Sequence, residues 1–262
     1  MKSPSVAVLI ASRNRPDLIQ QSFGQFASDG YENKYCSVIE CGTDRSLITD
    51  YPSIWYSDED FLGKCFGHNV GLQILKLRQP YDYYIFCMND VFIEKEQHFV
   101  RNLVEVMEAN PDIGVLSPTE TNTSYPGANP SGVGLRTVTT CDYLFLVIRG
   151  SLVERFGFLN PKFKYCWGAI HEYSYFTYGA GFRVVYYDDI SYRHLGGSTY
   201  GQKNTATISR ADYKRNAKNF AADYFIENYG EDWDSIFWST ASSQHKIEIN
   251  TYAIHRKVWE SL

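Results

Sequence analysis

An apolar run that ends at two adjacent polar residues is the part of this chain best suited to chemistry. Residues 83–88 have the pattern of a buried strand, and Asn89 and Asp90 follow it directly. In an open α/β sheet, ligands bind in the crevice outside the carboxyl ends of the strands. A carboxylate at that place suits Mg²⁺ or Mn²⁺, which prefer oxygen ligands. The alternative is an ordinary Asn-Asp turn, and both interpretations stand on this stretch alone.

The first loop of the chain, which follows the first predicted strand, is also polar. The apolar run 6–11 passes directly into Arg13, Asn14 and Arg15, and Pro16 suits the first turn of a helix because its missing N–H costs nothing there. Strand, polar loop and helix in this order form the opening unit of a nucleotide-binding α/β fold.

Acidic residues end the next two predicted strands. Strand 36–39 ends at Glu40, and strand 54–56 ends in the acidic residues 58–60. The segment 119–135 is rich in Gly, Pro, Ser, Thr and Asn and is expected to be a long, functional loop. Apolar periodicity predicts further helices over 67–77, 97–109, 151–156 and 211–228, and strands over 113–116, 143–148 and 182–187.

Length and charge restrict the class of protein. With 262 residues, the chain is long enough for one large α/β domain, or for one domain plus a helical extension. A formal charge of −5 differs from the basic footprint of nucleic-acid binders, so nucleic acid is not an expected partner. Basic residues gather at helical spacing only over 210–218, where a solvated face is expected and peripheral contact with anionic lipid is the alternative.

Cysteine usage and the N-terminus bear on the compartment. The six cysteines include no Cys-x-x-Cys pair, and several lie in apolar runs, which indicates buried, reduced thiols. The first apolar run is too short for a signal-peptide core or a membrane span. We therefore expect no transmembrane segment and a cytoplasmic protein.

Four segments, in this order and spacing, resemble a family 2-type glycosyltransferase of the GT-A fold. Residues 6–16 resemble that family's first strand and Asn-Arg-Pro loop, and residues 40–44 its acidic turn after the second strand. Residues 60–71 match a family segment without a gap at its Leu, second Gly, Asn and last Gly positions, and residues 88–91 resemble its Asp-x-Asp metal motif. The resemblance covers roughly residues 5–235. It implies a Rossmann-like α/β fold with a mixed, mainly parallel sheet flanked by helices.

The resemblance also implies a metal site and a donor site. Asp90 would hold Mn²⁺ or Mg²⁺, Asn89 would orient the water shell of the metal, and His194 would reach the metal or the diphosphate of a nucleotide-sugar donor. Acidic residues after strands two and three would bind the base or ribose, and arginines of the first loop would pair with phosphate. For each acid, a cap or turn former is the alternative. The implied donor-binding residues are Arg13, Asn14, Arg15, Glu40, Asp60, Asn69 and Asn89.

The catalytic base is where this chain departs from the family pattern. The family has a Glu-Asp pair in an aromatic segment before a helix, and residues 165–173 lack that pair. Counting forward from Phe163 places Ala169 at the base position, whereas counting from the Trp-Gly pair places His171 or Glu172 there. We expect Glu172 to be the base, with His171 as the second candidate. The alternative is that Glu172 only stabilises the first turn of a helix.

The sequence thus predicts an inverting, metal-dependent glycosyltransferase. It would move a sugar from a nucleotide-sugar donor to a hydroxyl of a glycan, lipid-linked or protein acceptor, with a catalytic domain over residues 1–200 and a helical extension over 201–262. The segment 119–135 would act as a flap over the substrates. The alternative function is a catalytically silent nucleotide-sugar or glycan binding module on the same scaffold.

Overall fold

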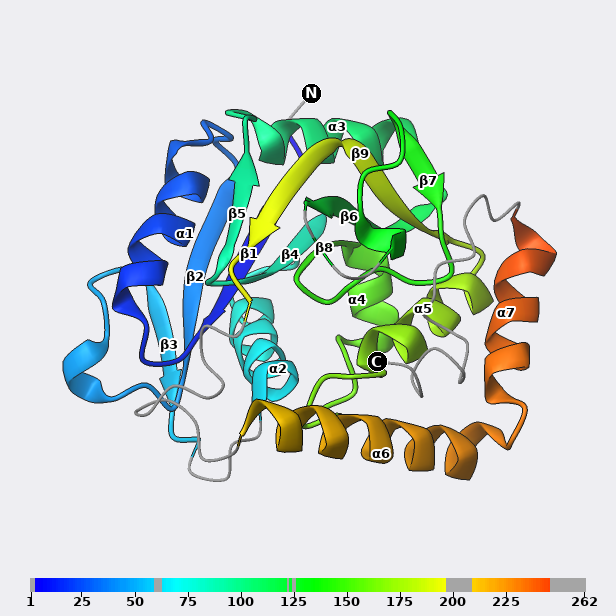
Figure 1. Ribbon diagram of the computed structural model, residues 1–262. Coiled ribbons are helices and arrows are strands. Elements are labelled where there is room, and N and C mark those ends of the chain that lie inside the picture. The colour runs from blue at the N-terminus through cyan, green and yellow to red at the C-terminus, as the bar shows by residue number, and fades with distance from the viewer. Residues whose placement is uncertain (1–2, 59–62, 122, 124–125, 197–208, 246–262) are drawn as a thin grey trace.

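One sheet forms the centre of the molecule in the computed structural model, which describes residues 3–58, 63–121, 123, 126–196 and 209–245 (Figure 1). Its strand order is β3-β2-β1-β4-β8-β6-β9-β5, and β7 pairs with β9 outside this path. The strands are β1 (Val6–Ser12), β2 (Lys34–Cys41), β3 (Ser53–Tyr56), β4 (Tyr83–Met88), β5 (Val91–Glu94), β6 (Ile113–Thr121), β7 (Leu135–Thr137), β8 (Phe145–Arg149) and β9 (Arg183–His194).

The sheet is mixed but mainly parallel. Strands β3, β2, β1 and β4 are parallel to one another, and β6 is parallel to β9. Strand β8 lies antiparallel between β4 and β6, so β6 and β9 again run in the direction of β4. The carboxyl ends of β1, β2, β4, β6 and β9 therefore meet at one edge of the sheet, together with the amino end of β8.

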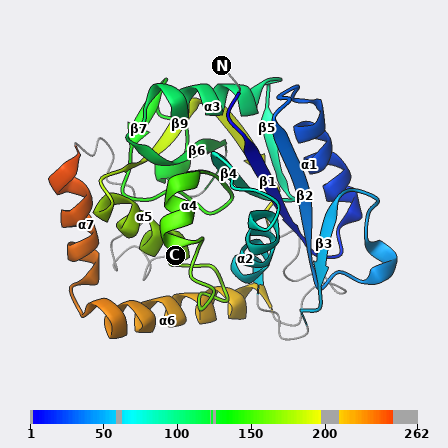
Figure 2. The same ribbon diagram turned by 180° about the vertical axis from the view of Figure 1, so that it is seen from behind.

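Helices cover both faces of this sheet (Figures 1 and 2). Helices α1 and α3 share one face, where Phe26 and Phe99 contact at 5.1 Å between ring centroids. Helices α2, α4 and α5 lie on the other face, where Phe86 of β4 stacks at 3.5 Å on Phe158. The helices are α1 (Pro16–Ser28), α2 (Gly63–Lys76), α3 (Phe99–Ala109), α4 (Gly150–Phe156), α5 (Ala169–Gly179), α6 (Arg210–Tyr229) and α7 (Trp233–Gln244).

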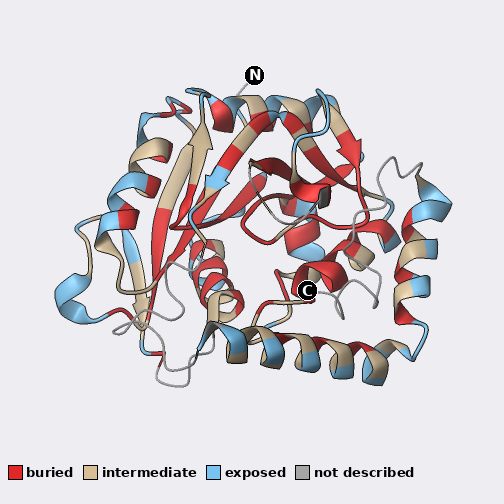
Figure 3. Ribbon diagram, viewed as in Figure 1, coloured by how far each residue is buried: buried red, intermediate tan, exposed pale blue. Residues whose placement is uncertain are grey.

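Burial on both faces explains the continuous apolar runs of the central strands. Every residue of β1 and of β4 is buried, as the red strands of Figure 3 show. Parallel strands covered on both faces read as near-continuous hydrophobic segments and do not alternate with polar residues. This pattern made β1 and β4 predictable from their sequence.

The C-terminal helices α6 and α7 pack on α5 through aromatic rings. Tyr175 of α5 stacks on Phe237 of α7 at 4.4 Å between ring centroids and contacts Tyr229 of α6 at 5.8 Å, while Phe225 of α6 stacks on Trp233 of α7 at 4.5 Å. No helix in the described part of the chain is long and apolar enough to span a bilayer. The division of the chain at residue 200 and its cytoplasmic location stay predictions.

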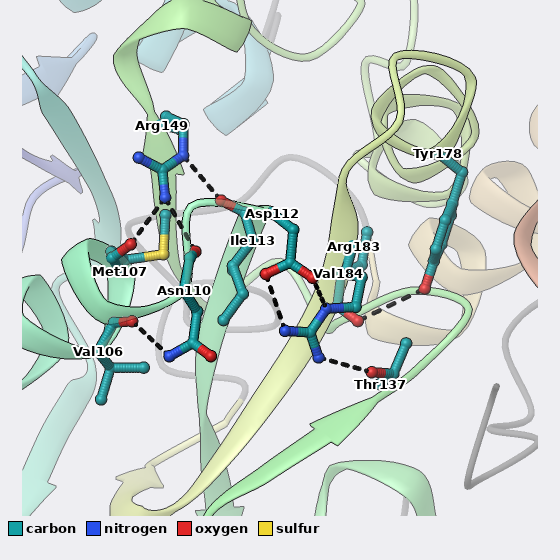
Figure 4. Close-up of polar contacts among 10 residues, drawn as sticks. All are labelled: Val106, Met107, Asn110, Asp112, Ile113, Thr137, Arg149, Tyr178, Arg183 and Val184. Atoms are coloured by element: carbon teal, nitrogen blue, oxygen red, sulfur yellow. Dashed lines mark hydrogen bonds and ion pairs between the residues drawn. The ribbon is translucent and has the colours of Figure 1, made fainter. Parts of the chain in front are cut away.

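The opposite edge of the sheet is held by arginines (Figure 4). The Arg183 guanidinium donates to both carboxylate oxygens of Asp112, at 2.7 and 3.0 Å, and to Thr137 at 3.2 Å. Arg149 donates to the carbonyls of Ile113 and Met107 at 2.9 and 2.8 Å. These bonds tie the amino ends of β6 and β9 to the carboxyl end of β8.

The predicted α/β class with a mainly parallel sheet is confirmed, with several changes of boundary. Strand β6 runs on to Thr121, so the predicted flap segment begins inside the sheet. Strand β9 runs on to His194. Val91–Glu94 is a separate strand that turns back to pair with β9, and α2 begins at Gly63 instead of residue 67.

Candidate active site

Asp90 and His194 meet at the carboxyl edge of the sheet. Asp90 follows β4, and His194 is the last residue of β9. The Leu195 N–H donates to the Asp90 carbonyl at 3.0 Å, and Val91 pairs with His194, so the backbones are joined where the two strands end. Topology thus brings together two residues that lie more than a hundred positions apart in the sequence.

The His194 imidazole lies between two carboxylates. Its Nε2 is 3.4 Å from Asp90 Oδ2, and its Nδ1 is 3.3 Å from Glu120 Oε1. Burial lowers the pKa of His194, but hydrogen bonds to Asp90 and Glu120 and their negative charges outweigh it and raise that pKa to about 9. Without a cation, this imidazole is protonated at neutral pH and neutralises its neighbours.

The donor types fit a divalent cation. Asp90 offers a carboxylate oxygen and His194 an imidazole nitrogen. Glu120 contacts the other ring nitrogen of His194, and metal-binding histidines commonly donate their second N–H to a carboxylate in this way. Glu120 Oε2 is buried and has no hydrogen-bond partner among the described residues. Within those residues no group of three or more His, Cys, Asp or Glu could hold a metal by itself. Two protein ligands would leave the other positions to phosphate and water.

A hydrogen-bonded chain links Asn89 to Glu40. The Asn89 N–H donates to the Ala11 carbonyl at 3.2 Å, and its side-chain amide donates to Ser12 Oγ at 3.1 Å. Ser12 in turn hydrogen-bonds the Glu40 carboxylate, which also accepts from Thr43 Oγ1 at 2.6 Å. Burial raises the pKa of Glu40, and these hydroxyl donors oppose that rise. Glu40 is therefore a buried acceptor at the end of β2.

The first loop is held over the ends of β2 and β3. Arg13 pairs with Asp58 at 3.0 Å, and the Asp58 side chain is almost fully buried. Asn14 accepts from the Asp44 N–H at 2.8 Å through its side-chain oxygen. A Cβ at Gly42, whose φ is +64°, would lie 2.9 Å from Asp58 Cβ, so this close approach requires glycine.

Arg15 lies near the Asp90 side of the edge. It donates to Asp17 at 2.7 and 2.9 Å. The Asp17 hydrogen bond is the largest cause of its raised pKa, and the Asp90 charge also contributes, so the guanidinium is within electrostatic range of Asp90. Asp60, predicted to bind the base or ribose, lies outside the described residues.

Asn69 joins α2 to the loop after α4. Its side-chain amide donates to the carbonyls of Cys65 and Leu159, both at 2.7 Å. These bonds account for both amide hydrogens, so the observed contacts of Asn69 are structural. Its predicted part in donor binding stays a prediction.

Glu172 contacts the C-terminal helix α6. Its Oε1 accepts from the hydroxyls of Tyr224 and Tyr229, both at 2.8 Å, and its Oε2 accepts from Asn160 at 3.1 Å. No hydrogen bond or ion pair observed in the described residues joins it to Asp90 or His194. His171 is buried in the first turn of α5. The catalytic roles of both residues stay predictions, and the three donors give Glu172 a structural task.

Several residues at this edge were missed by sequence reasoning. Glu120 was assigned to a loop, because the polar end of β6 does not read as a strand. Asp58 was grouped with its acidic neighbours, and only its position directly after β3 marks it. Lys64 lies within the segment 60–71 but not at one of its matching positions. Asp142, which lies shortly before β8, belongs to no motif, and the antiparallel direction of β8 brings it to this edge.

Comparison with known proteins identifies the fold. No protein-family model matches the chain, and no curated protein sequence is similar to it. The mannosyltransferase PcManGT from Pyrobaculum calidifontis, in complex with GDP-Man and Mn²⁺, superimposes with a TM-score of 0.60 and 12% identity, over 93% of this chain and 74% of that one.

Two further solved structures agree. TarS 1–349 from S. aureus, in complex with UDP, superimposes with a TM-score of 0.58 and 14% identity over 89% of this chain and 69% of that one. GalNAc-T7 with UDP, GalNAc and Mn²⁺ superimposes with a TM-score of 0.63 and 11% identity over 93% of this chain, which spans 53% of the GalNAc-T7 chain. These neighbours are glycosyltransferases of the GT-A type, so the chain has a GT-A fold.

Proposed function

We propose that this protein is a glycosyltransferase that uses a nucleotide-sugar donor and a divalent cation. The observation that carries the proposal is the Asp90–His194–Glu120 arrangement at the carboxyl edge of a GT-A sheet, at the place where such sheets bind ligands. Three GT-A neighbours contain GDP-Man or UDP, and two of them contain Mn²⁺, which supports the same ligand classes here.

The edge divides into two parts with different tasks. Glu40 and the Arg13–Asp58 pair lie at the ends of β2 and β3, where hydrogen-bonding acceptors suit the base or ribose. Asp90 and His194 lie at the ends of β4 and β9, and Arg15 is within electrostatic range of Asp90. A cation bound there would supply positive charge to the departing diphosphate. His194 must lose its proton to bind the cation, because only neutral imidazole is a ligand.

The proposed transfer is a single displacement with inversion. An acceptor hydroxyl attacks the anomeric carbon, the bond to the diphosphate breaks, and the nucleoside diphosphate leaves with the electron pair. Glycans, lipid-linked sugars and proteins all carry such hydroxyls, and each remains within the proposed acceptor class.

A thermal-shift experiment tests the proposal. UDP, GDP, UDP-glucose and GDP-mannose are each added with MnCl₂ or with EDTA. A ligand present at 100 times its Kd stabilises the folded state by about 2.7 kcal/mol, which is a readily measured rise in Tm. We expect one nucleotide to raise the Tm only with Mn²⁺, and Asp90→Ala to remove that rise.

Asp112→Ala is the matched control for this experiment. It removes an equivalent carboxylate at the opposite edge of the sheet, where Asp112 pairs with Arg183 (Figure 4). We expect Asp112→Ala to keep the nucleotide shift. A wild-type chain that shows no shift with any nucleotide and metal would refute the proposal.

A catalytically silent binding module is the second candidate. Its support is the first turn of α5, where Ala169 and Ile170 are buried apolar residues and the Glu172 carboxylate accepts from three donors. Metal-dependent nucleotide binding without release of nucleoside diphosphate from any donor would favour this candidate.

A further inference from the structure

Asp142 lies at the carboxyl edge of the sheet because of the direction of β8. This strand is antiparallel to β4, with Cys87 paired to Phe145. The pairing extends one step further, since the Met88 N–H donates to the Leu144 carbonyl at 3.1 Å. Asp142 lies two residues before Leu144, so it extends beyond this last bond to the carboxyl end of β4, where Asn89 and Asp90 form a turn. Asp142 therefore belongs to the site although it lies far from every sequence motif.

The backbone of Asp142 is fixed and its carboxylate is left available. The Asp142 N–H donates to the Tyr186 hydroxyl at 2.8 Å, and the carboxylate accepts from the Tyr143 N–H. No side chain among the described residues donates a hydrogen bond to that carboxylate. Unlike Glu120, Asp142 is partly exposed, so a substrate hydroxyl can reach it.

The charged groups around Asp142 belong to the candidate active site. Lys64, Glu120 and His194 all act on it electrostatically. Lys64 is held in place by a hydrogen bond from its Nζ to the Tyr143 carbonyl at 3.0 Å, and it lies 4.6 Å from the centre of the Tyr143 ring. Asp142 thus shares the electrostatic environment of Glu120 and His194 and makes no hydrogen bond or ion pair with either.

The other acids of the region are either paired or buried out of reach of an acceptor. Asp90 faces His194 Nε2, and Glu120 faces Nδ1 of the same ring through Oε1, while Glu120 Oε2 is fully buried. Glu172 accepts three hydrogen bonds from Asn160 and two tyrosines of α6. A general base needs a carboxylate oxygen that can take up a proton from the acceptor without first losing a strong donor.

We propose that Asp142 is the catalytic base of this protein, an inference that rests on the proposed transferase function. The acceptor hydroxyl passes its proton to the Asp142 carboxylate as its oxygen forms the new bond to the anomeric carbon. The bond from that carbon to the diphosphate breaks, and its electron pair leaves with the nucleoside diphosphate. The protonated Asp142 then returns the proton to solvent. One base and one displacement suffice for inversion.

The environment of Asp142 also favours proton uptake. Burial raises the pKa of its carboxyl group, the Lys64 charge opposes that rise, and the Glu120 charge adds to it. A carboxylate with a raised pKa accepts a proton near neutral pH better than an ordinary one.

Asp142→Asn tests the assignment. The variant keeps the shape of the side chain and removes a negative charge beside Glu120, so we expect it to fold. The assay follows nucleoside diphosphate release from UDP-glucose and GDP-mannose with MnCl₂, with water as the acceptor. We expect kcat to fall by about 10²–10⁴-fold, while the Kd of the nucleoside diphosphate, read from the thermal shift, changes by less than about threefold.

Asp112→Asn serves as the matched control, because it makes the same chemical change at the opposite edge and should leave kcat unchanged. Asp142→Ala provides a second test. If the carboxylate acts as a base, formate should restore part of its kcat, whereas a residue that only positions other groups would show no rescue.

Three results would overturn the assignment. Wild-type kcat in Asp142→Asn would remove Asp142 from the chemistry. An unchanged kcat with a KM raised only for the sugar nucleotide, and an unchanged Kd for the free diphosphate, would make it a sugar-binding residue instead. Nucleotide binding by a wild-type chain without turnover would refute the base while leaving donor binding intact, and an absence of any nucleotide binding would refute the transferase proposal itself.

Discussion

Replacement of Glu172 by Gln should destabilise the protein and leave its chemistry intact. Glu172 is 3% exposed, and its carboxylate accepts three hydrogen bonds, two from hydroxyls of α6 and one from Asn160. Burial, followed by the hydrogen bond to Glu172, raises the pKa of Tyr224 to about 12. The phenols are therefore held as neutral donors to a charged acceptor, which is the strong kind of hydrogen bond.

The size of the effect follows from the number of bonds. A hydrogen bond to a charged group contributes about 1.5–3 kcal/mol. Glutamine keeps one oxygen acceptor, but its NH₂ group cannot accept from the donors on the other side. Loss of one or two charge-assisted bonds should lower the free energy of unfolding by about 2–4 kcal/mol, which corresponds to a fall in Tm of roughly 4–16 °C.

A double-mutant cycle with Tyr229→Phe measures this network. The two single variants and the double variant are unfolded by urea, and we expect a coupling energy of about 1–2 kcal/mol between them. Tyr213→Phe is the control on the same helix, because the Tyr213 hydroxyl donates to the neutral carbonyl of Tyr165 at 2.6 Å and not to Glu172. An unchanged Tm for Glu172→Gln combined with lost turnover would show instead that this carboxylate is catalytic.

Three further predictions concern packing and pH. Gly71→Ala should lower the free energy of unfolding by about 1–3 kcal/mol, because its Cβ would lie 2.4 Å from Ile39 Cδ1. Gly24→Ala on α1, where a Cβ meets nothing within 4 Å, should raise it by about 0.5–1 kcal/mol, and urea unfolding of both variants compares them directly. In EDTA, His194→Gln should lower the free energy of unfolding by up to about 3 kcal/mol near pH 6 and by little above pH 9. The reason is that the pKa of His194 is about 9 in the folded state and about 6.5 in the unfolded state, so its protonation stabilises the fold fully below pH 6.5 and this stabilisation is lost as the pH rises through 9. Burial, aided by the Lys64 charge, lowers the pKa of His68 to about 3. Only the unfolded chain therefore takes up this proton between about pH 6.5 and 3, and the free energy of unfolding of the wild type should fall over that range. A free energy of unfolding in urea that stays constant over that range would contradict the lowered pKa of His68.

Local patterns predicted the elements that are buried on both faces and missed those whose partners are distant. Strand β6 continues through Thr119, Glu120 and Thr121 because these residues pair with β9 some seventy positions later. A run of Thr, Glu and Thr beside a loop rich in Gly and Pro favours a loop by itself, so the strand depends on a pairing that no local pattern contains. Glu120 was missed for the same reason.

The candidate site divides in the same way. Asp90 was identified from the abrupt end of an apolar run, and His194 from the resemblance to family 2-type glycosyltransferases, and the structure brings these two together. Asp142 follows no such pattern, since its segment reads as the approach to another apolar strand. Its place at the edge depends on whether β8 runs parallel or antiparallel to β4, which the sequence of β8 does not specify.

The same reasoning separates the two candidate bases. The sequence favoured Glu172 because it lies in the segment that resembles the acid-bearing segment of family 2-type glycosyltransferases, but such a resemblance does not reveal which donors reach a carboxylate. Three donors already occupy the oxygens of Glu172, so a proton from the acceptor would have to displace a hydrogen bond that also anchors α6. Asp142 has a single backbone donor and lies beside the groups that would bind the diphosphate. Proton transfer at Asp142 therefore leaves the attachment of α6 intact, whereas proton transfer at Glu172 would couple every turnover to loosening of the C-terminal helices.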